Sequence, residues 1–468
     1  MSYTLDAVVD DVQIDAPFDV LDAVITGAVH TPEAPEYAAH VTPWNLAVQL
    51  TPSAVVDART AEDVAAAVRF AGAFGLTAGV QGTGHGAIPG IAGHLLVSTK
   101  GLDEVTVHPE GWARVGAGVK WLRVVEAAAP YGLAPLSGSV TDVGVVGYTT
   151  GGGVGPMART YGIAADKVRA FDVVTGDGVV RRVTPTENPD LFWALRGGKG
   201  TAGIVTAVEF DLVHQPTFYG GSLWFDAVDA PQVIAAWRTW ADELPEAGTT
   251  SFGLFQLPPL PGVPPMLAGK MTLSIRFLWT GDAAEGERHL NRIRAVAPAI
   301  LDDCALKPYT AVDSVHTDPV DPTPAIDPAI LLSEFPAEAA DRLLEVGGHG
   351  SGSSLILLEV RALGGQYARA PQHPDAFDHR GARFSVLAVG LAATPDMAAQ
   401  GMVDAERVFD ALARWDSGRV WPNFGPVHDA DSARRAYEEA TRERLAAIVQ
   451  AYDPDGVLHY GRWTRSVA

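Results

Sequence analysis

Hydrophobic and polar positions change their period several times along the chain, and each change marks an element. Apolar residues recur at helical spacing from Val64 to Ala71, behind Thr60, whose hydroxyl can cap a helix with Asp63 at its third position. This pattern predicts a helix that ends at Gly75, and the apolar run over residues 76–80 predicts a strand after it. The strand leads directly into a glycine-rich loop.

The elements that follow keep this mixed character up to Gln215. A helical pattern stops at Pro130, and two β-rich runs flank Thr175-Gly176-Asp177-Gly178, which is typical of a hairpin. The predicted elements, in order, are strands at 95–98 and 113–115, a helix at 121–129, the hairpin at 171–183 and an alternating strand at 204–213. Helices and strands mixed in this way predict an α+β fold for the first region.

Residues 216–415 show a different pattern of strands and loops. Proline-rich loops at 257–266 and 318–328 separate long alternating strands, among them 271–279 and 355–360. We interpret this region as a second domain built on a sheet. Residues 1–45 show no clear period, and the last segment places Leu445, Ile448, Val449 and Tyr452 on one helical face before a turn at 453–456.

Composition excludes several classes of protein. Of the 468 residues, 34 are Lys or Arg and 56 are Asp or Glu, so the net charge of −22 disfavours nucleic acid as a partner. No stretch approaches the roughly 18 uninterrupted apolar residues of a membrane span, and the acidic N-terminus does not resemble a signal peptide, so we expect no membrane partner and a cytoplasmic protein. Cys304 is the only cysteine, which excludes an internal disulfide, and no metal-ligand spacing is present, so no metal site is expected.

Candidate chemistry begins in the loop Gln81-Gly82-Thr83-Gly84-His85-Gly86. Glycines let backbone N–H groups cradle an anion, and the histidine places an imidazole beside whatever the amides hold. With a second glycine-rich run at 144–155, this loop indicates a nucleotide cofactor; a tight turn with a surface histidine is the alternative. A Rossmann motif is excluded because no βαβ unit surrounds the second run, and Gly197–Thr201 is not a Walker loop because glycine follows Lys199.

Taken together, the ordered motifs resemble the flavin-binding domain of the vanillyl-alcohol-oxidase superfamily, and within it the berberine-bridge-enzyme-like oxidases. The motifs are QGTGHG (81–86), VGVVGYTTGGGVG (143–155), PDLFWALRGG (189–198), GIVTAVEF (203–210), LEVRALGG (358–365) and DPDGVLHYGR (453–462). The resemblance implies an α+β fold with a PCMH-type FAD-binding domain at 1–215. It also implies a substrate domain at 216–415, with an antiparallel sheet flanked by helices, and a segment at 416–468 that returns to the FAD-binding domain.

The resemblance also implies how FAD is held. His85 stands at the position of the histidine that bonds covalently to the flavin 8α-methyl carbon, and Val140 stands where a second, cysteinyl link would form, so we expect a single link. Val143 occupies the position that influences oxygen access, and a small residue there resembles the oxidase state. The implied cofactor-binding residues are Gln81, Gly82, Thr83, Gly84, His85, Gly86, Val143, Gly144, Gly147, Tyr148, Gly151, Gly152, Gly153, Gly155, Ile204 and Asn423.

The function that the resemblance implies is that of an FAD-dependent oxidase. A hydride would pass from an alcohol or amine carbon of a small organic substrate to flavin N5, and O2 would reoxidise the flavin to give H2O2. A dehydrogenase with another acceptor, a flavin-dependent cyclase or lyase of natural-product metabolism, and a flavin-free protein are the alternatives. The substrate and the oligomeric state stay open.

No single catalytic base stands out in the sequence. Glu359 and Arg361 share one face of a strand, and we interpret them first as a structural ion pair, with a catalytic role as the alternative. Trp421 and Asn423 lie where the family often has a tyrosine and an asparagine beside the flavin, and Tyr148 replaces a flavin-contacting histidine. The catalytic candidates are Glu359, Arg361, Trp421, Asn423 and Tyr148, with His459, Tyr460 and His379, the last of which we expect in a surface turn.

Overall fold

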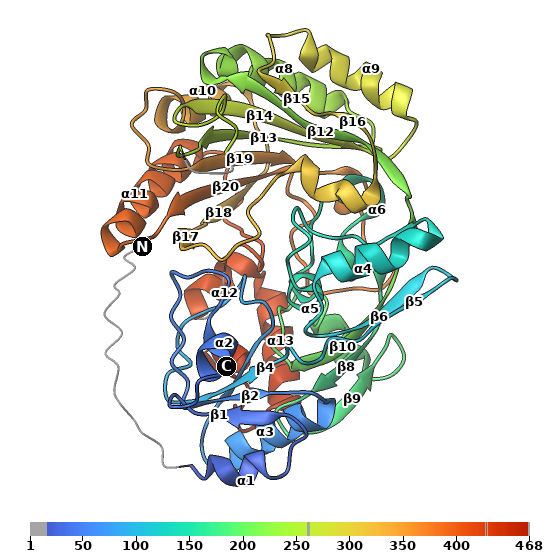
Figure 1. Cartoon of the computed structure of the whole chain (residues 1–468), viewed down its shortest axis with the longest axis vertical. Coiled ribbons are helices and arrows are strands. Elements are labelled where there is room, and N and C mark those ends of the chain that lie inside the picture. Colours follow the sequence, from blue (N-terminus) through green and yellow to red (C-terminus); the bar gives the residue numbers. More distant parts are fainter. Residues whose placement is uncertain (1–15, 260–262, 426, 428, 467–468) are drawn as a thin grey trace.

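Two sheet-based halves lie one above the other in the computed structural model (Figure 1). The structure describes residues 16–259, 263–425, 427 and 429–466, so the outer limits of the expected domains, residues 1 and 468, and part of the loop at 257–266 lie outside the described residues. Helices and strands are mixed in the lower half, and antiparallel pairing dominates the upper half. The α+β fold class predicted from the sequence is confirmed.

The lower half contains two sheets. The first has the order β1-β2-β4-β3, in which β2, β4 and β3 are parallel and β1 is antiparallel to β2. Its strands are β1 (Ala28–His30), β2 (Ala54–Asp57), β3 (Ala78–Gln81) and β4 (Leu95–Ser98). Helix α3 (Ala61–Ala73) packs against this sheet, and Thr60 and Asp63 form the predicted capping box at its start. The helix α1 (Phe18–Asp22) and the helix α2 (Tyr37–Val41), together with β1, occupy a region where the sequence shows no period.

The second sheet of the lower half is fully antiparallel, in the order β5-β6-β10-β8-β9. Its strands are β5 (Val105–His108), β6 (Trp112–Gly116), β8 (Val168–Val174), β9 (Val180–Val183) and β10 (Ile204–Asp211). The predicted hairpin is formed by β8 and β9. Around this sheet lie α4 (Trp121–Ala128), η1 (Ala129–Tyr131), α5 (Val145–Thr150), α6 (Ala158–Tyr161), η2 (Ala164–Lys167) and α7 (Pro189–Ala194), with the short pair β7 (Leu133–Ala134) and β11 (Val213–His214).

The upper half is built on a nine-stranded sheet in which every pair is antiparallel. Its central strands run in the order β12 (Thr217–Asp226), β14 (Met271–Trp279), β13 (Gly248–Gln256), β19 (Leu357–Ala362) and β20 (Phe384–Leu391). The short strands at its edges are β15 (Leu301–Asp302), β16 (Ala305–Pro308), β17 (Ala325–Ile326) and β18 (Ala329–Leu332). The strand predicted at 271–279 has the observed bounds, and the one predicted at 355–360 begins and ends two residues later.

The long helices of the upper half lie on the outer face of this sheet (Figure 1). They are α8 (Ala230–Glu243), α9 (Ala283–Arg294), α10 (Ala337–Gly347) and α11 (Pro395–Leu412), and the short helical turns η3 (Ala227–Asp229), η4 (Tyr309–Val315) and η5 (Gly365–Ala368) join the strands. Side chains such as Trp237, Leu343 and Val408 fill the core between helices and sheet. The other face of the sheet is turned toward the lower half.

The chain ends in the lower half. Helices α12 (Ala430–Ala436) and α13 (Glu439–Tyr452) precede the helical turn η6 (His459–Ser466), and α13 lies against α7. The backbone N–H of Ala78 donates to the carbonyl oxygen of Val457 at 2.7 Å, so the last segment adds to the edge of β3. None of the helices in the described part of the chain is long and apolar enough to cross a membrane.

Candidate functional site

The loop after β3 follows a path that depends on glycine. Gln81 ends the strand, and its side-chain Nε2 donates to the carbonyl oxygens of His40 at 3.0 Å and Val41 at 3.3 Å. At Gly84 the backbone φ is +79°, and a Cβ there would lie 2.5 Å from Pro43 Cα. Glycine alone meets both conditions without strain. The loop is thereby fixed between the strand end and the segment that follows α2.

His85 presents a neutral imidazole in this loop. Its Nδ1 lies 3.0 Å from Thr83 Oγ1, and its ring stacks on the indole of Trp44 with 4.7 Å between ring centroids. Burial lowers the pKa of His85 to about 4, so the ring carries no charge at neutral pH. Its Nε2 is buried and has no hydrogen-bond partner among the described residues. A neutral imidazole with an unused nitrogen is a nucleophile, which a covalent bond to a flavin requires.

The second glycine-rich run lies beside this loop. Gly144 is the N-cap of α5, and a Cβ on it would lie 3.3 Å from the side chain of Thr83. Gly147, in contrast, faces open space, with no atom of the described residues within 4 Å of a built Cβ. Two segments far apart in the sequence therefore form one surface, and part of that surface is bare backbone. Backbone of this kind is what allows close approach of a cofactor.

The end of this run is packed more tightly. A Cβ on Gly153, where φ is +78°, would lie 2.6 Å from the ring of Tyr148. The same construction places a Cβ of Gly151 2.1 Å from Asn423 Oδ1, and one of Gly155 2.0 Å from the carbonyl oxygen of Ser137. These glycines hold the run against its neighbours. Among the described glycines of the two runs, only Gly147 would place a Cβ in open space.

Tyr148 and Asn423 meet at the same place. The Tyr148 hydroxyl donates to the carbonyl oxygen of Ser137 at 3.3 Å, and burial raises the pKa of this phenol above its ordinary value. The Asn423 Nδ2 donates to the backbone carbonyl oxygen of Tyr148 at 2.9 Å. Tyr148 belongs to α5, and Asn423 is held against this helix by its hydrogen bond to the Tyr148 carbonyl oxygen. Neither is a base at neutral pH, because the phenol keeps its proton and an amide does not accept one.

Lys199 is a site residue that the sequence motifs missed. Its Nζ donates to the carbonyl oxygen of Gly147 at 2.7 Å and to Asn423 Oδ1, and it would lie 3.6 Å from a Cβ on Gly86. Burial lowers its pKa to about 8. The residue has φ +54°, a conformation that glycine adopts more readily. In the sequence, only its position within a run of glycines sets this lysine apart. In the structure, Lys199 places one cation between the two glycine-rich segments.

Two further residues of the predicted cofactor set belong to the core. Val143 is half-buried, and its carbonyl oxygen accepts a hydrogen bond from the backbone of Trp121 at 3.0 Å. Ile204 is 3% exposed and pairs with Val174 in the second sheet of the lower half. The structure thus places Val143 directly ahead of Gly144 and places Ile204 within packed strands.

The sheet of the upper half presents a polar row to the lower half. Ser251 on β13 pairs with Arg276 on β14 and with Arg361 on β19, and Arg361 pairs with Ser385 on β20. Residues directly opposite in neighbouring strands share one face, so the row crosses four strands on the side away from the helices. A small cavity lies against this row and is lined by Pro156, Thr250, Ser251, Arg276, His316 and Arg361.

Glu359 holds the charges of this row together. Arg276 Nη1 lies 3.0 Å and Arg361 Nη2 3.2 Å from its carboxylate, and all three side chains are almost completely buried. Although burial opposes it, the two guanidinium charges hold the pKa of Glu359 well below its usual range. Arg361 also donates to Ser139 Oγ at 2.9 Å, which ties the row to the segment before α5. Glu359 and Arg361 are an ion pair, and Glu359 is a permanently ionised carboxylate.

His316 is the second site residue that sequence reasoning missed. It follows η4, and its Nε2 lies 3.3 Å from Arg361 Nη2 and 3.8 Å from Glu359 Oε1. Burial, and then the charge of Arg276, lower the pKa of His316 well below its usual value. Its Nδ1 is buried and has no hydrogen-bond partner among the described residues. No motif surrounds it, so its role could not be identified before the fold was known.

The remaining catalytic candidates lie away from this row or are occupied. Trp421 is buried and donates its indole N–H to Tyr367 Oη at 3.2 Å. Tyr460 donates to the carbonyl oxygen of Val80 at 3.1 Å, and burial lowers the pKa of His459 to about 4. The expectation that His379 lies in a surface turn is wrong. It is 3% exposed, because Arg380 pairs with Asp166 and Asp375 and draws the turn inward.

Comparison with known proteins agrees with this geometry. An FAD binding domain family model matches residues 52–184. The (R)-6-hydroxynicotine oxidase of Paenarthrobacter nicotinovorans is 28% identical over 92% of this chain and 95% of its own. A protein named FAD-dependent monooxygenase FUP4, from Fusarium proliferatum, is 38% identical, but over 37% of this chain and only 34% of its own length. The match to this fungal relative thus covers about a third of it.

Solved structures share the fold over nearly the whole chain. The berberine-bridge-enzyme-like 1 protein of Physcomitrella patens superposes with a TM-score of 0.82 at 19% identity, covering 95% of this chain and 98% of its own. The 6-hydroxy-D-nicotine oxidase of Arthrobacter nicotinovorans superposes with a TM-score of 0.77 at 22% identity, covering 93% and 97%. A chitooligosaccharide oxidase gives a TM-score of 0.81 at 18% identity, covering 95% and 98%.

Proposed function

We propose that this protein is an oxidase of a small organic alcohol or amine. The chain belongs to the FAD-binding oxidoreductases of the vanillyl-alcohol-oxidase superfamily. The observation that carries the proposal is the neutral His85 with its unused Nε2, which lies in a glycine-rich loop beside the second glycine-rich run. When bound, FAD accepts a hydride from the substrate carbon and passes two electrons to O2, which leaves as H2O2. The substrate loses one hydride and one proton in the same turnover.

Residues of the lower half would hold the cofactor. The 81–86 loop and the bare backbone at Gly147 would receive it, and His85 would attach it covalently. The attachment is a single one, because Val140 has no thiol. Lys199 contributes a cation that has lost much of its hydration, and such a charge stabilises negative charge on a neighbouring group.

His316 is the side chain best placed to accept the substrate proton. Arg361, Trp421 and Asn423 are not bases, and Glu359 is already neutralised by two arginines. The His316 imidazole is neutral, and the Glu359 carboxylate 3.8 Å away would offset a charge formed on it. Hydride departure makes the substrate O–H or N–H strongly acidic, so a weakly basic imidazole suffices. The variant His316→Gln should lower kcat far more than it lowers the FAD content.

The test of the oxidase proposal has two parts. The purified protein is precipitated with acid, and the pellet is examined for yellow colour and for a mass increase of one FAD. The native protein is then supplied with alcohols, sugars and cyclic amines, and O2 consumption is compared with H2O2 release. One H2O2 per oxidised substrate is the expected result. Slow reoxidation of the reduced protein by O2 in stopped flow would instead identify a dehydrogenase.

A monooxygenase is the second candidate. A protein named FAD-dependent monooxygenase FUP4 is 38% identical over 37% of this chain, which supports this candidate. An oxidase leaves both oxygen atoms of O2 in H2O2, whereas a monooxygenase transfers one of them to the product. Turnover under ¹⁸O2 separates the two, because label in the organic product would identify the monooxygenase.

A further inference from the structure

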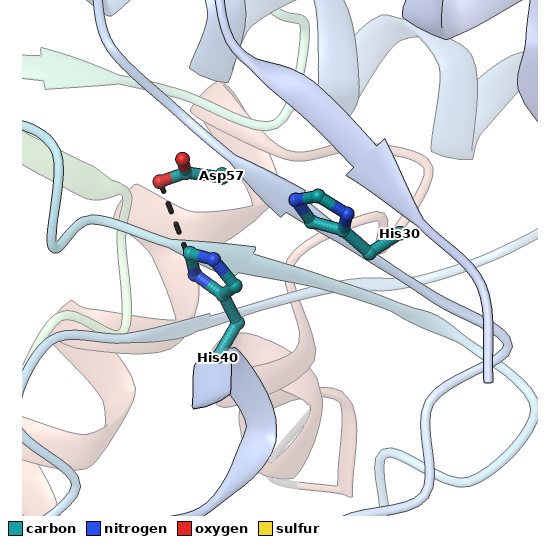
Figure 2. A group of neighbouring side chains, drawn as sticks. All are labelled: His30, His40 and Asp57. Atoms are coloured by element: carbon teal, nitrogen blue, oxygen red, sulfur yellow. Dashed lines mark ion pairs between the residues drawn. The ribbon is translucent and has the colours of Figure 1, made fainter. Parts of the chain in front are cut away.

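A cluster of two histidines and one aspartate lies at the edge of the first sheet. His30 ends β1, Asp57 ends β2, and His40 comes from α2, which packs against β2 and β4 (Figure 2). One possible ligand atom from each residue lies within 4.8 Å of the other two. The three residues are widely spaced in the sequence, so no spacing motif marks the cluster, and the sequence predicted no metal site.

The donor set is one that transition metals use. Two imidazole nitrogens and one carboxylate oxygen, with a further position open, occur at zinc centres and at non-haem iron centres. The side chains of His30, His40 and Asp57 are 15%, 16% and 7% exposed, so the cluster is nearly enclosed. His40 Nδ1 also lies 3.2 Å from Ser98 Oγ, a hydroxyl that can rotate away from this nitrogen when a cation binds to it.

The carboxylate of Asp57 supplies an independent indication. Its Oδ2 accepts two hydrogen bonds from Arg59, but its Oδ1 is buried and has no hydrogen-bond partner among the described residues. Figure 2 shows this carboxylate directed toward His40, whose Nδ1 is 3.9 Å from Oδ1. A buried carboxylate oxygen without a donor is costly, and a bound ion is one of the few explanations for it.

The charges around the cluster do not oppose a cation. Arg59 is directed at Oδ2, and Lys100 donates its ammonium to the carbonyl oxygen of Ala39 at 2.6 Å, so neither covers Oδ1. The Glu36 carboxylate lies 4.0 Å from His30 Nδ1 and is exposed, which adds a negative charge at the rim. The two carboxylates balance the two cations. The His30 and His40 rings are stacked, with 5.2 Å between centroids and 14° between planes, so at least one ring must rotate about its χ angles to direct its nitrogen at a shared cation.

We propose that His30, His40 and Asp57 bind one divalent transition-metal cation, with Zn²⁺ as the cation that this donor set fits. The bound metal would fasten α2 to the edge of the sheet. Gln81 donates to the backbone of His40 and Val41, and Trp44, shortly after α2, stacks on His85. The metal would therefore hold in place the segment that packs against the cofactor loop, and its role is structural rather than catalytic.

The test measures zinc binding to the purified holoprotein, prepared without a histidine tag and stripped with a chelator. After equilibrium dialysis against Zn²⁺, elemental analysis should find one zinc per chain, and titration calorimetry should give a single site. Asp57→Asn and His40→Gln should weaken this binding about a hundredfold or more, since each removes a ligand. His349→Gln, which changes an exposed histidine outside the cluster, is the matched control and should bind zinc as the wild type does.

Three zinc measurements would overturn the proposal. The first is wild-type protein that retains no zinc, and the second is Asp57→Asn that retains as much as the wild type. The third is loss of zinc in His349→Gln, which would show binding to a surface histidine. A variant that fails to fold is recognised by its flavin content, and Co²⁺ then serves as a second readout on the wild type. Its visible absorption reports a low-coordinate nitrogen and oxygen site directly, and spectra of fully hydrated Co²⁺ would count against the site.

Discussion

The lower side of the candidate site is formed mainly by backbone, and the upper side mainly by side chains. On the lower side, Gly84 and Gly153 have positive φ and lie so close to their neighbours that a side chain would not fit. On the upper side, four strands each contribute side chains to one row, and no backbone is exposed there in the same way. A surface made of backbone suits a ligand that stays the same, whereas a row of side chains can differ between proteins that share a fold but act on different substrates. The extent of the family match agrees, since it covers residues 52–184 and ends before the upper half begins.

The two sides also differ in how their charged groups are paired. The lower side holds a neutral imidazole, His85, and a buried cation, Lys199, whose pKa burial has lowered. The upper side holds Arg276, Arg361 and Glu359 in mutual contact. The first arrangement is incomplete without a ligand that brings negative charge, and the second is nearly complete without one. This contrast predicts that variants of the lower side change cofactor binding, and that variants of the upper side change stability and turnover.

The largest expected effect is that of His85→Ala. We expect complete loss of the covalent adduct, because among the described residues no other nucleophile lies in the 81–86 loop. Mass spectrometry of the denatured chain measures the result, and FAD that remains bound without a covalent bond is removed by acid. His349→Ala, at an exposed position, should keep the adduct. An adduct of unchanged mass in His85→Ala would place the link elsewhere.

The variant Glu359→Gln tests the upper side. It leaves two buried guanidinium groups without their shared carboxylate, so the free energy of unfolding should fall by about 3–5 kcal/mol. Denaturant titration measures this, and the covalent FAD content of the folded fraction should stay unchanged. Glu338→Gln is the control, because Glu338 pairs with Arg342 and Arg414 at the surface and should cost about 1 kcal/mol or less. Equal losses in the two variants would contradict the buried network.

The variant Gly84→Ala isolates the backbone contribution of the lower side. Gly84 and Gly350 both have positive φ, +79° and +83°, but a Cβ on Gly84 would lie 2.5 Å from Pro43 Cα, while one on Gly350 would meet none of the described residues. Gly350→Ala should cost about 1 kcal/mol from backbone conformation alone, and Gly84→Ala about 3 kcal/mol with loss of FAD. Thermal unfolding and flavin absorbance measure both. If the two variants behave alike, the close approach to Pro43 is not needed.

The elements that could be predicted from the sequence are those that depend on neighbouring residues, and the site residues that could not are those that meet only in the fold. The helix capped by Thr60, the hairpin at 171–183 and the strand at 271–279 depend on local spacing and turn residues, and the structure confirms them. His316 and the row around Arg276 could not be identified, because they meet only after strands distant in sequence pair in register. His379 was placed on the surface because a turn with a charged neighbour is typical of exposed loops. Two buried carboxylates, Asp166 and Asp375, instead draw Arg380 inward.

Within one pH unit below 6.5, the smallest expected effect is a difference in pH dependence between the two sides. The pKa of His85 is lowered to about 4 and that of His316 well below 6.5, so below pH 6.5 the unfolded chain binds protons that the folded chain excludes. Stability is therefore complete above that pH and is lost as the pH falls, by about 1.4 kcal/mol per unit for each histidine. In protein produced without FAD, whose His85 ring carries no covalent bond, His85→Gln and His316→Gln should each remove one such contribution from the slope of unfolding free energy against pH. For His85 the difference from wild type should stop growing near pH 4, where the folded ring itself takes up a proton, whereas for His316 it should continue to lower pH. A His316→Gln slope parallel to that of the wild type would mean that this imidazole is already charged or reached by water, and the proton acceptor would then have to be sought elsewhere in the row.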